Sequence, residues 1–211
     1  MKLNCLQLLP GLLALCLCGC ATSSVEQTWK SPSYTGGPKQ KLAVLAVDER
    51  ELLRQVLESH FVVNLTKQGQ SAFVTYDLLS LPAIKADREA AVASVREKGA
   101  DSVLILRLVD QITHANEVRA TPGYFAPSVA GYENADWYGY YSVAFTDMGT
   151  VWGGSSKDVY LETSLFDLKT GQRIWSAFTQ TVLKENADRV EEIAPLAQKI
   201  FAAMRKDGVI H

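Results

Sequence analysis

The chain has 211 residues, of which 47% are hydrophobic and 21% are charged, and its formal net charge is −2. This length is enough for one domain with a substantial core. Because basic and acidic residues nearly balance, there is no basic excess for binding nucleic acid or an anionic membrane surface, and we expect no nucleic-acid partner.

The N-terminal segment has the pattern of an export signal. Lys2 supplies a short positive start, and the run from Cys5 to Leu17 is almost entirely apolar. This run has the length of a secretory hydrophobic region and is too short to cross a hydrocarbon layer of roughly 30 Å as a helix. We therefore predict a lipoprotein signal peptide over residues 1–19.

The cysteines at the end of this segment alternate at Cys16, Cys18 and Cys20. Thiolates of a metal site are usually separated by two or more residues, whereas alternate residues of an extended segment point to opposite faces. The stretch Leu17-Cys18-Gly19-Cys20 instead resembles the bacterial lipobox. The resemblance implies cleavage before Cys20, a diacylglycerol thioether on its sulfur and acylation of its new amino group. An ordinary signal peptide that is cut elsewhere is the alternative.

The same resemblance implies a location for the mature chain. Ala21, rather than Asp, follows the lipidated cysteine, which implies delivery to the outer membrane with the domain facing the periplasm. Cleavage removes Lys2 and leaves 20 basic against 23 acidic residues. It also removes every cysteine except Cys20, so we expect no disulfide and no thiol for catalysis or zinc binding.

The segment after the cleavage site is rich in Ser, Thr, Gly and Pro and shows no apolar period. We predict the lipidated cysteine and a flexible tether over residues 20–40, in which a coil of about twenty residues would span on the order of 25 Å. Trp29 is the exception. A lone Trp in a linker docks on its own domain more often than it forms a ligand site, and we favour docking.

An α/β pattern begins at residue 41. The nearly continuous apolar run over 41–48 predicts a strand that is covered on both faces. Asp48 is placed to cap the next helix, with Glu51 completing a capping box. Apolar residues at helical spacing extend this helix through Lys67, and Gly69 ends it.

Two further strands are predicted over residues 71–79 and 101–112. Between them lies a helix that Asp87 caps and Gly99 ends. The alternation of strand, helix, strand, helix and strand predicts parallel pairing through right-handed crossovers.

The next stretch, residues 121–156, holds nine of the 19 aromatic residues of the chain and six of its glycines. A long insertion inside a compact domain is usually functional or disordered, and the aromatic content disfavours disorder. One interpretation is a contact surface for an envelope protein, a glycan or a second copy of the chain. The other is an extra strand over residues 140–146, with the remaining aromatics capping an open end of the sheet. The candidate contact residues are Tyr124, Phe125, Tyr132, Trp137, Tyr138, Tyr140, Tyr141 and Trp152.

The C-terminal third has a different period. Residues 158–168 alternate strongly, a Lys-Thr-Gly turn follows, and residues 172–183 return, which predicts an antiparallel hairpin with Gly171 at positive φ. A final helix has apolar residues at helical spacing from Val190 to Met204. Pro195 either kinks this helix or marks the start of a second one.

Together these elements predict a single α/β domain over residues 41–211. It should have three layers, with a mixed sheet of about five to six strands and helices packed on it. The first half of the sheet should be parallel and the C-terminal hairpin antiparallel.

The sequence offers little for catalysis. Three scattered histidines, at His60, His114 and His211, lack paired carboxylates at metal-ligand spacing, so we expect no metal and no cofactor. The Gly-Gly-Ser-Ser-Lys run at 153–157 lacks the spacing of a phosphate loop, and no Gly-x-Ser-x-Gly elbow is present. We expect no enzyme, and a hydrolytic activity is the weakest alternative.

Several of these motifs carry a family resemblance. The lipobox, KLAVLAVD, GADSVLIL, the aromatic insertion and LETSLFDLKTGQRIWSA together resemble proteobacterial outer-membrane lipoproteins. Their domain is similar to the Tol-type amino-terminal domain, the curli-secretion lipoprotein and the lipoprotein activators of penicillin-binding proteins. The likeness covers roughly residues 41–208. It implies a non-enzymatic envelope protein, with Cys20 as the one family site residue that can be placed.

Two functions from different classes follow. The first is a lipid-anchored periplasmic binding or accessory protein that contacts a partner through the 121–156 insertion. The alternative is a subunit of an oligomeric curli-type secretion channel. Membrane-spanning strands need about 9 to 11 alternating residues, and the alternation over 141–146 is shorter than that.

Overall fold

The computed structural model describes residues 22–109, 136–138, 140, 158–182 and 190–211. The strands are β1 Thr22–Lys30, β2 Lys41–Val47, β3 Ser71–Val74, β4 Ser102–Val109, β5 Asp158–Asp167 and β6 Arg173–Val182. The helices are α1 Glu51–Lys67, α2 Leu81–Ala86, α3 Arg88–Glu97 and α6 Ile193–Lys206. No helix in this part of the chain is long and apolar enough to cross a membrane.

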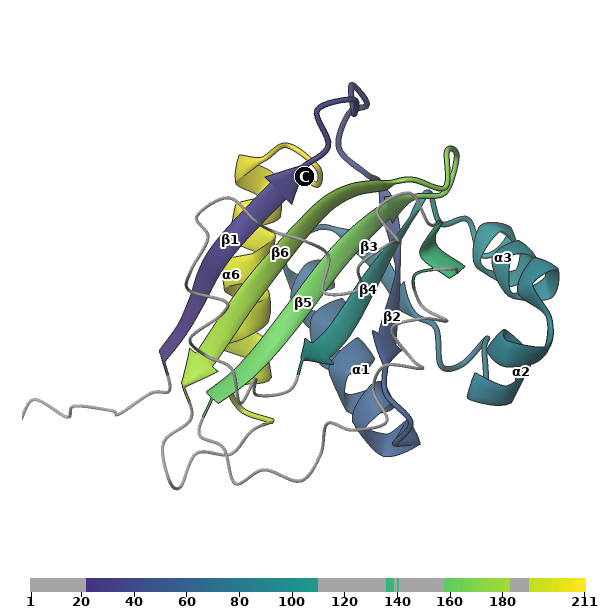
Figure 1. Ribbon diagram of the computed structural model, residues 1–211, viewed down its shortest axis with the longest axis horizontal. Helices are drawn as coiled ribbons and strands as arrows, with labels where there is room; N and C mark the ends of the chain where they lie inside the picture. Colours follow the sequence, from purple (N-terminus) through teal and green to yellow (C-terminus); the bar gives the residue numbers. More distant parts are fainter. Residues whose placement is uncertain (1–21, 110–135, 139, 141–157, 183–189) are drawn as a thin grey trace, which may run out of the picture.

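The described strands form one mixed sheet of six in the order β1-β6-β5-β4-β2-β3 (Figure 1). Strand β2 pairs in parallel with β3 and with β4, whereas β4, β5, β6 and β1 pair antiparallel to one another in turn. The hairpin turns at Gly171, whose φ is +75°. These observations confirm the predicted α/β fold, its parallel first half and its antiparallel hairpin.

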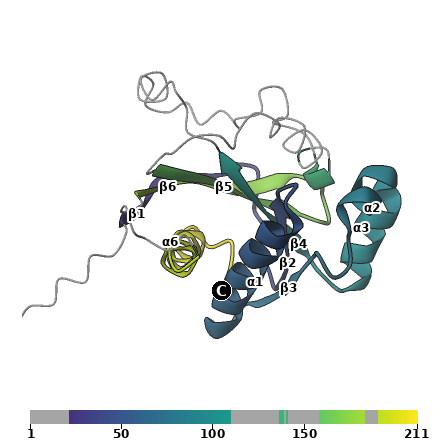
Figure 2. The same cartoon turned by 90° about the horizontal axis from the view of Figure 1, so that it is seen from below.

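Helices cover both faces of the sheet. On one face, α1 and α6 pack side by side over even-numbered residues of β2 and β4, and their Phe61 and Phe201 rings meet edge to face at 5.6 Å. On the other face, α2 and α3 contribute Ile84 and Val95 to a second cluster with Leu45. Figure 2 shows α1 and α6 beneath the sheet and α2 and α3 beyond β2 and β3. The layers follow from the nearly continuous apolar character of β2 and β4.

The start of α1 differs from the prediction. Asp48 does not cap the helix, because α1 begins at Glu51 and its N-cap is Arg50, whose backbone is extended and which makes no side-chain cap bond. The Asp48 carboxylate instead accepts hydrogen bonds from the Arg50 backbone N–H at 2.8 Å and from its guanidinium at 2.7 and 2.9 Å. The carboxylate of Asp48 is therefore bonded to Arg50 and not to the first turn of α1.

The caps of the next two helices are ordinary. Asp87 accepts a hydrogen bond from the backbone N–H of Ala90 at 3.0 Å and begins α3, as predicted. Sequence patterns did not indicate α2, which Ser80 caps by accepting from the Ala83 N–H at 3.2 Å. Its six residues are too few to show a helical period.

Strand β1 overturns part of the predicted tether. The flexible tether expected over residues 20–40 is wrong for Thr22–Lys30, which pair along β6 as an edge strand. Val25 packs against the core, and the guanidinium of Arg173 lies 5.3 Å from the centre of the Trp29 ring. The docked Trp29 is therefore confirmed.

The last helix resolves the question at Pro195. Helix α6 begins at Ile193, so Pro195 is its third residue. The first backbone N–H groups of a helix have no acceptor within it, and proline there breaks no hydrogen bond. Of the two alternatives, the helix start is correct.

Candidate functional site

The structure places three of the eight candidate aromatic residues. Trp137 and Tyr140 are only 2% and 1% exposed and belong to the core on the α2/α3 face, so the expectation of a contact surface is wrong for these two. Tyr138 is partly buried, and its hydroxyl donates a hydrogen bond to the Ile84 carbonyl. Outside the described residues lie Cys20, Tyr124, Phe125, Tyr132, Tyr141 and Trp152.

The aromatic turn that contains Trp137 and Tyr140 packs on the hairpin. The Tyr140 N–H donates to the Asp136 carbonyl at 2.9 Å, which closes a helical turn. The Tyr140 ring lies 5.4 Å from Phe166 of β5, measured between ring centres. These contacts agree with the alternative interpretation of the insertion, in which its aromatics cap the sheet.

A buried ion pair lies beside this turn. Arg107 of β4 and Glu162 of β5 are paired across the ladder, with their Nη1 and Oε2 atoms 3.3 Å apart and their side chains 5% and 2% exposed. Burial and the nearby Glu162 carboxylate raise the pKa of Tyr140 well above its usual value. The phenol is therefore neutral at physiological pH.

A second buried charged cluster fastens α1 to the sheet. Glu58, which is fully buried, accepts hydrogen bonds from the backbone N–H groups of Ala46, Thr75 and Tyr76 at 3.1, 2.7 and 2.9 Å. The Nε of Arg54 donates to it at 3.0 Å. Burial raises the pKa of Glu58, although Arg54 and the backbone donors oppose this effect. Donors surround the carboxylate, which makes it a structural group.

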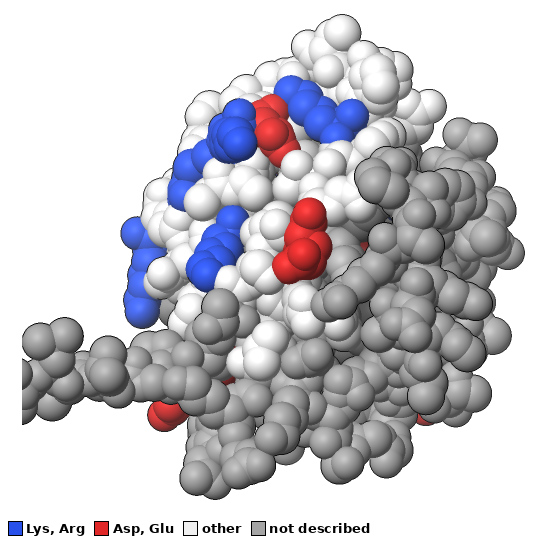
Figure 3. All heavy atoms as spheres, turned by 60° about the vertical axis from the view of Figure 1, so that its left-hand side comes forward, with Lys and Arg blue, Asp and Glu red and all other residues white. Residues whose placement is uncertain are grey.

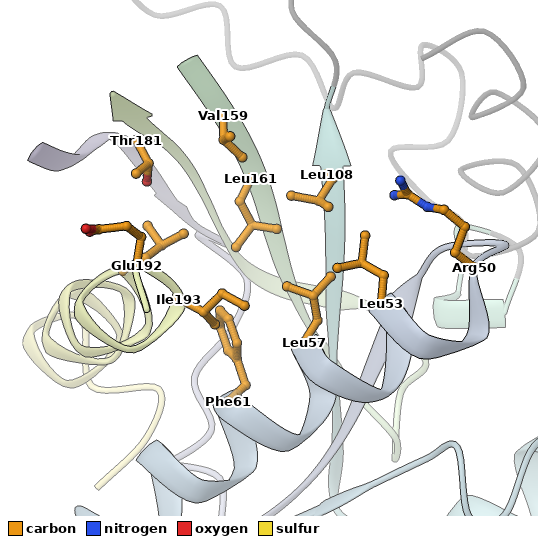
Figure 4. A pocket seen from close by; sticks show the side chains of 11 residues that line it. Arg50, Leu53, Leu57, Phe61, Leu108, Val159, Leu161, Thr181, Glu192 and Ile193 are labelled. Carbon is orange, nitrogen blue, oxygen red and sulfur yellow. The ribbon is translucent and has the colours of Figure 1, made fainter. Parts of the chain in front are cut away.

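An apolar groove with a volume of about 330 Å³ lies between α1 and α6, on the face of the sheet that these two helices cover (Figure 4). Figure 4 shows Leu53, Leu57 and Phe61 rising from α1 toward strands β4 and β5. The full lining is Arg50, Leu53, Leu57, Phe61, Leu108, Val159, Leu161, Thr181, Glu192, Ile193 and Leu196. Pockets for small molecules commonly measure about 300–1,000 Å³ and are lined mainly by apolar side chains.

The α1/α6 groove has charged residues only at its two ends. Arg50 lies where α1 begins and is held by Asp48, and Glu192 lies where α6 begins. The lining between them is aliphatic or aromatic except for Thr181. Such a surface suits a flexible hydrocarbon, because each buried CH₂ contributes about 0.8 kcal/mol.

The start of β1 lies beside this groove. Ser23 pairs with Thr181 in the ladder, and their hydroxyl oxygens are 3.0 Å apart. Lys199 of α6 donates a hydrogen bond to the Ser23 carbonyl. The first residues of β1 are therefore fixed both to the strand that borders the groove and to the helix that forms one wall.

Sequence reasoning missed the groove, although it identified the helical stripes that line it. Leu53, Leu57 and Phe61 have the spacing of any core-facing stripe, so the pattern alone does not distinguish packed residues from residues that line a cavity. Within the described ranges, no group of three or more His, Cys, Asp or Glu side chains could hold a metal ion.

No model of a known protein family matches the sequence, and no curated protein matches it. The solved structures of similar fold include the following two. The PelC dodecamer from Paraburkholderia phytofirmans is 12% identical, with 90% of this chain and 100% of that chain covered and a TM-score of 0.47. Lipoprotein GNA1162 from Neisseria meningitidis is 12% identical, with 78% and 96% covered and a TM-score of 0.41. At this level of likeness, neither structure indicates what the present chain binds.

Proposed function

We propose that this chain is a lipid-anchored accessory protein of the bacterial envelope, which binds other envelope components and catalyses no reaction. The observation that carries the proposal is the position of β1, which begins at Thr22, two residues after the cysteine of the lipobox. Lipid on Cys20 would join the sheet almost directly. The domain would then be held against the periplasmic side of the outer membrane.

The 121–156 insertion remains the proposed contact with a partner. Trp137 and Tyr140 are buried against the hairpin and so serve as its attachment to the domain. The other aromatic candidates of the insertion remain the proposed contacts: Tyr124, Phe125, Tyr132, Tyr138, Tyr141 and Trp152. Aromatic side chains are enriched at the centres of protein interfaces, which supports this assignment.

The anchor is tested by labelling cells with an alkyne analogue of palmitate. The unchanged chain and a Cys16→Ser variant should both carry the label and sediment with membranes. A Cys20→Ser variant should lose the label and be released from the membrane fraction. Label that persists in the Cys20→Ser chain would contradict the lipidation site.

The contact is tested by placing a photoreactive residue at Phe125 in intact cells and identifying what it captures. The matched control carries the same residue at Leu52, which is 76% exposed on α1. An envelope protein or glycan captured at position 125 but not at position 52 would support the contact. Identical capture at both positions, or capture of lipid alone, would contradict it.

The oligomeric state separates the binding protein from the channel alternative. Native mass spectrometry of the detergent-extracted lipoprotein should show a monomer or a dimer. A ring of many copies would instead favour the secretion-channel subunit.

A further inference from the structure

We propose that the α1/α6 groove holds one acyl chain of the lipid attached to Cys20. This inference rests on the proposed lipidation and adds a specific binding site for the lipid within the domain. The occupant is a hydrocarbon chain of the protein's own anchor, bound in the same molecule that carries it.

The chemistry of the groove fits a hydrocarbon. Its walls are side chains of α1 and α6, and its floor is formed by Leu108, Val159 and Leu161 of strands β4 and β5 (Figure 4). Thr181 contributes the polar atom nearest the start of β1. An acyl chain needs no hydrogen-bond partner and leaves no polar group of its own buried without one.

The position of the groove brings it within reach of the anchor. Thr22 pairs with Val182, and Ser23 pairs with Thr181, which lines the groove. Two residues of extended chain span at most about 7 Å, so Cys20 lies no further than this from Thr22. A lipid on this cysteine would therefore start within about 7 Å of Thr22, a distance that an acyl chain can span.

Two apolar side chains are exposed at this end of the domain. Val182 and Val190 are 44% and 40% exposed, and both lie at the end of the sheet where β1 and α6 begin. Lys and Arg side chains gather instead at the opposite end, where β1 finishes at Lys30 and α6 finishes at Arg205 and Lys206 (Figure 3). Attraction of basic side chains to anionic headgroups would place the opposite end on the membrane, whereas a bound acyl chain places the groove end there.

The number of acyl chains permits this arrangement. The lipobox resemblance implies three chains on Cys20, two from the diacylglycerol and one on the amino group. Two chains are enough for stable anchoring. One chain can therefore occupy the groove while the other two remain in the bilayer.

The test uses a fatty acid that carries a terminal diazirine and an alkyne, fed to cells that make the full lipoprotein. After irradiation of intact membranes, mass spectrometry maps the crosslinked peptides of the mature chain. We expect the label on Cys20 and intramolecular crosslinks to residues of the groove such as Leu57, Leu161 and Leu196.

Two variants refine the test. Leu53→Trp, which partly fills the groove, should reduce these crosslinks at least fivefold. Leu52→Trp, its neighbour on the exposed side of α1, should leave them unchanged. The wild-type crosslink map does not depend on whether either variant folds.

Each result identifies which proposal fails. Absence of label on Cys20 would overturn the lipid anchor and this inference together. A labelled Cys20 whose crosslinks fall only on phospholipid or outside the groove would overturn this inference alone. Groove crosslinks of equal yield in the Cys20→Ser chain, given the same probe in phospholipid vesicles, would show that free lipid or membrane lipid is the occupant and would also overturn it.

Discussion

Glu58 connects α1 to the ends of two strands. Its carboxylate accepts three backbone N–H groups, from Ala46 of β2 and from Thr75 and Tyr76 after β3. Arg54, also fully buried, pairs with the same carboxylate from one helical turn away. Removing one partner of such a pair leaves the other charge buried without compensation.

We therefore expect Glu58→Ala to lower the free energy of unfolding by about 3–5 kcal/mol. Urea denaturation followed by circular dichroism measures this change. Glu51→Ala is the matched control, because Glu51 contacts the same Arg54 at 3.7 Å but is 47% exposed. Exposed pairs are worth about 0–1 kcal/mol, so a comparable loss in both variants would contradict the role given to Glu58.

Asp167 and Lys39 form a pair, with Oδ1 and Nζ 2.5 Å apart, that makes stability depend on pH. Burial alone would raise the pKa of Asp167, but hydrogen bonds from Lys39 and Thr170 outweigh burial and lower it. A carboxyl whose pKa is lower in the folded state adds stability above its unfolded pKa, about 3.9, and loses this contribution as pH falls through the folded pKa.

Asp167→Asn should therefore lower the free energy of unfolding at pH 7, and its difference from the unchanged chain should shrink as pH falls below about 4. Urea titrations across this range measure the difference. Asp77→Asn, which changes an exposed carboxyl after β3, should show no such convergence. A difference for Asp167→Asn that stays constant with pH would contradict the ion pair.

Predictions that depend on neighbours in sequence succeeded at this scale. Asp87 caps α3 and Gly171 has positive φ, and in each case the partner atoms lie within a few residues. The cap predicted at Asp48 is wrong because the helix begins later, with Arg50 as its N-cap, and the Asp48 carboxylate pairs with Arg50. The burial of Trp137 depends on the hairpin and the α2/α3 layer, and no local pattern distinguishes a buried aromatic from one at an interface.

At the scale of elements, β1 shows why part of the sheet was not predictable. Its sequence, TSSVEQTWK, is polar and has a register shift between Val25 and Gln27 that breaks the alternation. Its hydrogen-bond partners belong to β6, about 150 residues away along the chain. The parallel strands were predictable because a nearly continuous apolar run is typical of a strand that is buried on both faces.

Strand β1 should be part of the stable domain. A chain that begins at Thr22 should unfold cooperatively, whereas one that begins at Lys41 should unfold at a lower urea concentration and aggregate, because the edge of β6 is then exposed. Equilibrium denaturation and light scattering measure the two effects. Equal urea midpoints for the two chains would contradict this role of β1 and would favour a flexible tether over these residues.

The turn between β5 and β6 should favour glycine at position 171. Gly171 has a φ of +75°, and an added Cβ would lie 3.3 Å from the Cβ of Asp136. Gly171→Ala should cost about 1–2 kcal/mol in the free energy of unfolding, measured by urea denaturation. Gly37→Ala should be nearly neutral, because no atom lies within 4 Å of the Cβ that it would add and the φ of Gly37 is not positive. If the two variants are equally stable, the turn is not under this constraint.

At the scale of the whole molecule, the proposed lipid on Cys20 would lie two residues before β1 and would therefore hold the domain close to the membrane. The domain of the mature lipoprotein should abut the headgroup layer in a supported bilayer. A twenty-residue Gly/Ser insertion between Ala21 and Thr22 should introduce a water-filled gap on the order of 25 Å. Neutron reflectometry measures both profiles, and the same gap without the insertion would contradict direct attachment.

The strand order also fixes when the domain can fold. On the proposed export route, β1 would be the first part of the mature chain to leave the export channel. Its partners on β6 lie 145 to 160 positions further along, from the Lys30–Trp175 pair to the Thr22–Val182 pair. Pairings of such long range form slowly, because the intervening chain must first be ordered. The cysteine would therefore meet the enzymes that cleave and acylate it while the segment behind it is still unpaired, and completion of the sheet would draw the finished anchor against the domain.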